Sequence, residues 1–184
     1  MKWQVQTVFA GQGETERPKQ HPPLLGLRRP RRPVYNRRIM TETHPLDAYR
    51  TSDATRFAVS TTIRYEDLDP NRHVNHARYL AYLEECRLAL RRHLNAELAL
   101  PEALGWAVGA LSIQYRRALL YPSTVRVETA PIAVGRTSFS LGYGMFDHDG
   151  CAAVASTRSV CLDESGRPTP LPARLADWLS GRMA

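Results

Sequence analysis

The chain has 184 residues, of which 43% are hydrophobic and 23% charged, enough for one domain with a substantial core. Its net charge of +7 lies in residues 1–40, which hold nine Lys or Arg and two Glu; the remainder carries sixteen charges of each sign. A neutral remainder gives no reason to expect a nucleic acid partner, and no apolar run reaches the ~18–20 residues of a membrane helix. We therefore expect a soluble protein with no membrane partner.

Residues 1–45 show no apolar periodicity and include prolines at positions 18, 22, 23, 30 and 33. Such a segment cannot bury enough surface to offset its ordering entropy, so we expect a disordered, basic extension. A targeting peptide is disfavoured because Val8-Phe9-Ala10 is too short for a signal core. The arginine cluster at Arg28–Arg32 leaves open an arm that binds nucleic acid or membrane, but a basic tail alone is a signal of low specificity. We favour an over-long gene start, with Met40 as the true first residue and residues 46–184 as the domain.

The following pattern predicts one strand at 57–66 and one helix from about 76 to 94. Phe57, Val59 and Thr61 occupy one face of the strand, and Asn75 is a suitable N-cap for the helix. Four further strands are expected near 107–117, 125–134, 139–145 and 152–162, before a short helix that ends near Leu179. Short turns join these strands, so we expect an antiparallel sheet and an α+β class.

The strand at 139–145 has two unequal faces. Phe139, Leu141, Tyr143 and Met145 are large and apolar, whereas the alternate positions hold only serine and glycine. A face of small residues is expected where something bulky packs close to the sheet.

The three cysteines, Cys86, Cys151 and Cys161, have no metal-ligand spacing such as C-x-x-C. An odd and sparse set indicates reduced thiols, and therefore a cytoplasmic location.

The loop before the first helix carries a recognisable motif. Tyr65, Asp67, Asp69, His73-Val74-Asn75 and Tyr79 match most of Y-x-D-x-D-x-x-G-H-V-N-N-x-x-Y. This segment resembles the signature of the 4-hydroxybenzoyl-CoA thioesterase family. The resemblance implies a hotdog fold, an antiparallel sheet of about five strands wrapped around one long central helix. The wide apolar arc of the helix at 76–94 agrees with a helix largely covered by protein.

The resemblance also implies a site. Asp69 takes the place of the catalytic carboxylate, as general base toward water or as nucleophile on a thioester. Backbone amides near Asn75 and His76 would polarise the carbonyl, and His73 and Tyr79 would contact the substrate. No metal is implied and no cofactor is needed beyond the coenzyme A carried by the substrate. Without the motif, Asp69 would be interpreted only as a turn residue.

Two positions depart from the motif. Arg72 stands in place of a glycine that often serves an unusual backbone angle, and His76 replaces the second asparagine. Arg72 could reach a phosphate of coenzyme A, as could Arg116-Arg117, although a solvated charge is the simpler interpretation.

We therefore predict an acyl-CoA thioesterase acting on a small-to-medium acyl group, assembled as a homodimer or homotetramer. Leu80, Leu83, Phe139 and Met145 are expected to set the length of the acyl pocket. An alternative is a non-catalytic module that binds acyl-CoA or an acyl-carrier protein. An enoyl-CoA hydratase is less favoured because the D-x-N-P-x-H spacing is absent.

Overall fold

The computed structural model describes residues 46–183; the extension expected for residues 1–45 lies outside them. The elements follow one another as η2 (Asp47–Arg50), β1 (Phe57–Thr62), η3 (Tyr65–Asp67), α1 (His76–Leu98), β2 (Gly105–Tyr115), β3 (Thr124–Val134), β4 (Ser138–Asp147), β5 (Gly150–Leu162) and α2 (Ala173–Ser180). This order confirms the predicted strands and helices, although β1 ends four residues earlier than expected and α1 ends four residues later.

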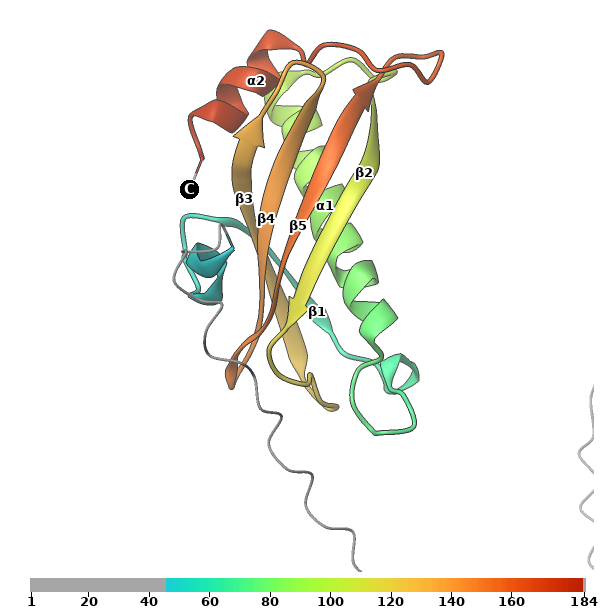
Figure 1. The fold of residues 1–184 in the computed structure, drawn as a ribbon, viewed down its shortest axis with the longest axis vertical. Helices are drawn as coiled ribbons and strands as arrows, with labels where there is room; N and C mark the ends of the chain where they lie inside the picture. Colours follow the sequence, from blue (N-terminus) through green and yellow to red (C-terminus); the bar gives the residue numbers. More distant parts are fainter. Residues whose placement is uncertain (1–45, 184) are drawn as a thin grey trace, which may run out of the picture. The chain divides into compact units, whose positions relative to one another are not determined.

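The five strands form one antiparallel sheet in the order β1-β3-β4-β5-β2. The long helix α1 lies along one face of the sheet (Figure 1). The large side chains of β4 point toward this helix and belong to the main core, which is why β4 is the most deeply buried strand. The predicted α+β arrangement of a sheet on one long helix is confirmed.

One face of α1 is buried and the opposite face is not. Tyr79, Tyr82, Leu83, Cys86, Leu90 and Leu94 recur at helical spacing and are buried against the sheet. Leu80 and Leu88 lie on the outer face and are 41% and 42% exposed. The expected wrapping of the helix is therefore only half complete in a single chain.

The small face of β4 is covered by the segment that precedes β1. A methyl group at Gly142 would overlap the ring of Tyr49, which is fully buried on this face. A methyl group at Gly144 would similarly overlap the Tyr49 carbonyl and the Phe146 ring. The bulky partner predicted for this face is thus Tyr49, whose hydroxyl donates to the Ala130 carbonyl at 3.0 Å.

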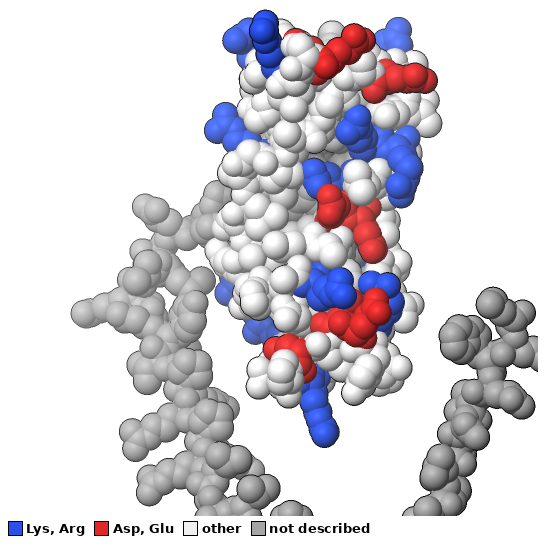
Figure 2. All heavy atoms as spheres, turned by 90° about the vertical axis from the view of Figure 1, so that its right-hand side faces the viewer, with Lys and Arg blue, Asp and Glu red and all other residues white. Residues whose placement is uncertain are grey.

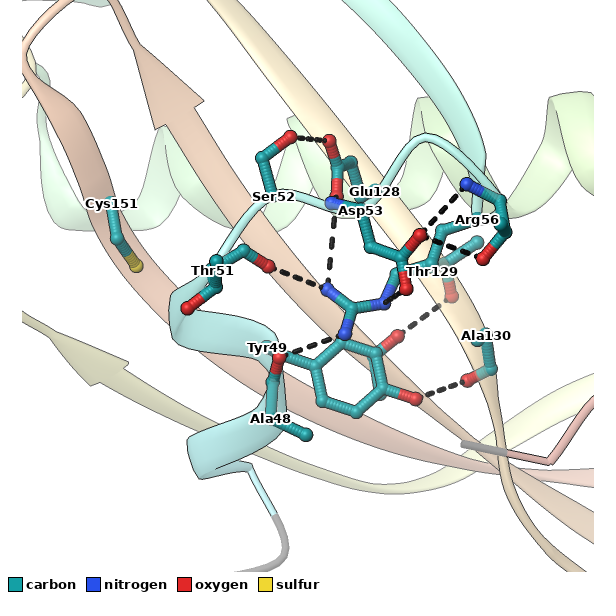
Figure 3. Close-up of polar contacts among 12 residues, drawn as sticks. Ala48, Tyr49, Thr51, Ser52, Asp53, Arg56, Glu128, Thr129, Ala130 and Cys151 are labelled. Carbon is teal, nitrogen blue, oxygen red and sulfur yellow. Dashed lines mark hydrogen bonds and ion pairs between the residues drawn. The ribbon is translucent and has the colours of Figure 1, made fainter.

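A buried carboxylate fastens the same segment to the sheet (Figure 3). Glu128 of β3 accepts hydrogen bonds from the Ser52 hydroxyl and from the Asp53 amide, the latter at 2.9 Å. Arg56 pairs with Glu128 at 3.7 Å, and its guanidinium stacks over the Tyr49 ring at 4.5 Å from the centroid. Both charges have partners, as buried charges require.

Candidate active site

A hollow of about 360 Å³ opens beside the start of α1. Four of the five predicted site residues line it, namely Asp69, His73, His76 and Tyr79, together with Val74, Tyr115, Arg116, Arg117 and Ala118. Two larger hollows, of about 460 and 470 Å³, lie elsewhere and contain none of the predicted residues. The fifth predicted residue, Asn75, does not line the hollow but caps the helix beside it, where its Oδ1 accepts from the Ala77 amide at 2.9 Å.

The loop that carries Asp69 is a tight turn fixed at both ends. The Asp69 amide donates to the His73 carbonyl and the Arg72 amide donates to the Asp69 carbonyl, both at 2.9 Å. The Val74 amide then donates to the Leu119 carbonyl at 2.9 Å, which ties the turn to the β2–β3 connection. The position of the Asp69 carboxylate is therefore set by backbone hydrogen bonds.

Asp69 is held in its charged form. Partial burial raises the pKa of Asp69. Hydrogen bonds from Asn71 and the neighbouring His73 lower it by more, so the pKa lies below its ordinary value. The Asn71 amide donates to Asp69 Oδ1 at 2.8 Å, and His73 Nδ1 lies 3.5 Å from the same oxygen. The Asp69 side chain is 19% exposed, so it is reachable from the hollow.

Arg72 adopts the left-handed backbone conformation that the motif's glycine would favour, with φ at 64°. The turn therefore keeps its backbone path despite the substitution. The conformation costs a non-glycine residue roughly 1–2 kcal/mol, and the hydrogen bonds of the turn offset it.

Asp67 supports the loop that carries Asp69. Its carboxylate is buried, accepts from the Tyr82 hydroxyl at 2.8 Å and from the Arg64 amide at 2.9 Å, and pairs with Arg78 at 3.2 Å. Burial raises its pKa, but these partners lower it to below its ordinary value. Asp67 thus joins the loop to α1 and holds Asp69 against the helix start.

The backbone amides at the start of α1 differ in their hydrogen bonding. The Asn75 amide donates to the Asp67 carbonyl at 2.8 Å and the Arg78 amide to the Asn75 carbonyl at 2.8 Å. The His76 amide has no hydrogen-bond partner among residues 46–183. The sequence led us to expect two polarising amides; the Asn75 amide is already used, which leaves the His76 amide.

Two tyrosine rings form the wall of the hollow. Tyr79 and Tyr115 meet edge to face with centroids 5.0 Å apart. The Tyr115 hydroxyl donates to the His76 carbonyl at 3.1 Å, and the Tyr79 hydroxyl accepts from the Leu119 amide at 3.1 Å. No site role was predicted for Tyr115, because its contact with the helix joins residues far apart in the chain.

Two sequence expectations about this region are wrong. Arg117 forms a two-pronged ion pair with Asp147 and also donates to the Gly150 carbonyl at 3.0 Å, so it is not free for a phosphate. Leu83, Phe139 and Met145 are buried in the closed core and Leu80 faces outward, so none of the four lines the hollow.

A second hollow of about 370 Å³ lies on the other side of Asp69. Its lining consists of Tyr65, Leu68, Asp69, Arg72 and Tyr121. The rings of Tyr65 and Tyr121 meet edge to face at 5.9 Å. Asp69 therefore borders two hollows, both near the lower end of the ~300–1,000 Å³ typical of ligand pockets.

Among the described residues, three potential metal ligands converge at Asp147, His148 and Asp149, none of which lines the hollow. Asp147 is already paired with Arg117, and the other two are exposed. No helix within residues 46–183 is long and apolar enough to cross a membrane.

A five-stranded antiparallel sheet on one long helix (Figure 1) is the arrangement of the hotdog fold. The profile of the thioesterase-like superfamily matches residues 63–179, more than half of the chain. The chain belongs to this superfamily. A search of curated proteins finds no significant match.

Solved structures agree with this assignment. A thioesterase from Thermus thermophilus, complexed with coenzyme A and Zn, is 27% identical, with a TM-score of 0.60 over 67% of this chain and 91% of that one. The PA2801 protein of Pseudomonas aeruginosa, a candidate thioesterase, is 26% identical, with a TM-score of 0.60 over 66% and 96%. The DHNA-CoA thioesterase of Staphylococcus aureus, 24% identical with a TM-score of 0.55 over 66% and 84%, shows the same fold.

Proposed function

We propose that this protein hydrolyses the thioester of a small-to-medium acyl-CoA, with Asp69 as base or nucleophile. One observation carries the proposal. The ionised Asp69 carboxylate and His76, whose amide has no partner in the described part of the chain, line the same hollow. A carboxylate beside an open amide at a helix start can supply both the attack and the polarisation that a thioester needs. The superfamily match and the coenzyme A bound to the Thermus thermophilus thioesterase support this substrate class.

The chemistry has two routes. As a base, Asp69 takes a proton from water while the oxygen attacks the carbonyl carbon; the C–S bond then breaks, and the proton passes to the leaving thiolate. As a nucleophile, Asp69 forms an acyl anhydride and releases the thiolate, and water hydrolyses the anhydride in a second step. In both routes the His76 amide binds the carbonyl oxygen as its negative charge develops.

Replacing Asp69 by Asn tests the assignment. We expect thiol release from an acyl-CoA panel to fall by at least about 100-fold in kcat, the usual contribution of a positioned base. Asp163→Asn is a matched control, because Asp163 also accepts a hydrogen bond from the amide two residues later but lies outside the site. Unchanged hydrolysis by Asp69→Asn would contradict the role. A burst of thiol release in the unaltered protein would identify the nucleophilic route.

The alternatives have different outcomes. A non-catalytic module would bind acyl-CoA or an acyl-carrier protein without hydrolysis in the unaltered protein. The contact between His73 and Asp69 makes an enoyl-CoA hydration assay a useful companion, since a hydratase would pair an Asp with a His. Hydration without thiol release would replace the thioesterase assignment.

We further infer that two copies associate along β2. This strand pairs only with β5 within the described residues, and its sequence contains no charged residue. Val108 and Leu111 on it are 39% and 42% exposed. Figure 2 shows the side that carries this edge, with a broad uncharged area beside a column of mixed charges. Free edges normally carry charges or other protection, so an uncharged edge fits a second copy.

A further inference from the structure

We propose that the hollow between Tyr65, Arg72 and Tyr121 holds the phosphopantetheine arm of the substrate, with Arg72 binding its phosphate. This inference rests on the proposed thioesterase function and deepens it. The acyl group would then occupy the opposite hollow, walled by Tyr79 and Tyr115. The thioester would lie between them at Asp69, which is the residue common to both linings.

Among the arginines that the structure describes near the site, Arg72 is the one whose side chain has no partner. Arg64 pairs with Glu66 at 2.9 Å, Arg78 with Asp67 at 3.2 Å, Arg116 with Asp47 at 3.9 Å, and Arg117 with Asp147. Within residues 46–183, the exposed Arg72 guanidinium has no carboxylate partner and no hydrogen bond. An unpaired arginine presents a planar set of donors suited to a phosphate.

The aromatic pair beside Arg72, Tyr65 and Tyr121, also suits a phosphopantetheine arm. Tyr65 is 76% exposed and Tyr121 is 47% exposed, although both are large aromatic residues. Both residues line the hollow, and each offers an apolar ring face and one hydroxyl group. A flexible arm with methylenes, amides and a terminal phosphate matches this combination of rings and one cation.

The two hollows differ in the exposure and charge of their walls, and this difference indicates which end of the substrate each would hold. Tyr79 is only 2% exposed, so one wall of the hollow at the helix start is formed by a core residue, whereas the facing Tyr115 is 47% exposed. The Arg72 hollow has exposed walls and an unpaired positive charge, and so suits the part of the substrate that must reach solvent and carry anionic groups. Asp69 borders the Arg72 hollow as well, so the phosphate must lie toward the Arg72 guanidinium and away from the Asp69 carboxylate, which limits the repulsion between the two anions.

Three thioesters that share one acyl group but differ in the thiol that carries it test this assignment. The substrates are the acyl-CoA, the acyl-phosphopantetheine and the acyl-pantetheine, which lacks the phosphate. In Arg72→Gln we expect KM to rise about fivefold for the two phosphate-bearing substrates, the upper value for an exposed ion pair, with kcat unchanged. KM for the acyl-pantetheine stays the same. Arg72→Gly should behave alike, because glycine accepts the backbone angle at this position.

Arg92→Gln is the matched control. Arg92 is exposed, has no partner in the described part of the chain, and lies ~24 Å along α1 from the helix start. Its substitution should leave all three KM values unchanged. An equal rise of KM for the acyl-pantetheine in Arg72→Gln, or no rise for any substrate, would overturn the assignment. So would a change of oligomeric state without a change of KM, because the hollow would then be a subunit contact.

Calorimetric titration with coenzyme A alone separates this inference from the proposed activity. Binding that weakens in Arg72→Gln but not in Arg92→Gln supports the phosphate site even if no thioester is hydrolysed. Hydrolysis that is indifferent to Arg72 leaves the activity standing and removes the site. Coenzyme A and a carrier protein both present a phosphopantetheine arm; assays with an acylated carrier protein beside acyl-CoA show which source the Arg72-dependent KM favours.

Discussion

Asp69 combines a low pKa with direct contact to His73, and these two properties set the acid limit of activity. Both proposed routes need the ionised carboxylate, so activity is lost as pH falls through the Asp69 pKa, which lies below its ordinary value of ~3.9. We therefore expect that protonation of Asp69 does not lower kcat/KM between neutral pH and pH ~5.

Replacing His73 by Gln should move that acid limit to higher pH. The positive charge of His73 is one of the causes that lower the Asp69 pKa, so its removal raises the pKa. The measurement is the acid limb of kcat/KM. His148→Gln is the control, because His148 is exposed and lies against Asp149 rather than Asp69. An acid limb that stays in place in His73→Gln would show that the hydrogen bonds from Asn71 dominate alone.

Residue identities in the site were predictable where the motif names them, and their partners were not. Asp69, His73 and Tyr79, which the motif names, and His76, which departs from it, line one hollow, and their roles stay predictions. Asp67 with Tyr82, and Tyr115 with His76, join residues from different elements, and a sequence pattern does not specify such pairs. The residues expected to set the length of the acyl pocket do not line this hollow, because three of them are packed in the core and Leu80 faces outward.

Among the elements, the segment before β1 depends most on a single buried charge. Glu128 is fully buried; burial raises its pKa, but the Ser52 hydroxyl, the Asp53 amide and Arg126 lower it to below its ordinary value. A lowered pKa contributes stability that is present above the unfolded value of ~4.3 and is lost as pH falls through the folded value.

Glu128→Gln should therefore reduce both stability and its dependence on acid. We expect the free energy of unfolding near neutral pH to fall by about 3 kcal/mol, because Arg56 loses its buried partner and keeps, as a carboxylate partner, only Asp53, which lies at 4.0 Å and is 45% exposed. Urea titrations from pH 7 to pH 3 should also show a smaller loss of stability in the variant. Glu66→Gln serves as control, since that carboxylate is 63% exposed and should change stability little. Equal acid dependence in Glu128→Gln and the unaltered protein would contradict this account.

The strands and helices were largely predictable because period-2 and helical apolar patterns coincide with burial, and because short turns leave only antiparallel neighbours. The small residues on one face of β4 correctly predicted a bulky cover. The identity of that cover as Tyr49 was not predictable, since its segment has no strand or helix pattern of its own.

At the scale of the whole molecule, β2 links assembly to the site. Tyr115, its last residue, lines the Asp69 hollow, so a second copy on this edge would lie directly beside the substrate. Leu111→Arg places a charge on the exposed edge and should convert the expected dimer to monomer in light scattering, with a fall in kcat/KM.

Met183→Arg is the comparison for that experiment. Met183 is 51% exposed near the C-terminus, which lies on the opposite side of the sheet from β2 (Figure 1). It should leave both mass and activity unchanged. A monomer for the unaltered protein, or a dimer that survives Leu111→Arg, would exclude β2 as the interface.

The close packing of Tyr49 against Gly142 of β4 also has an evolutionary consequence. The Tyr49 ring fills the volume that a side chain at position 142 would need, so neither position can change size alone. Lineages that acquire alanine or a larger residue at position 142 should carry a smaller residue at position 49, and those that keep tyrosine should keep glycine. Covariation between these two distant positions would thus record how the segment before β1 became part of the domain.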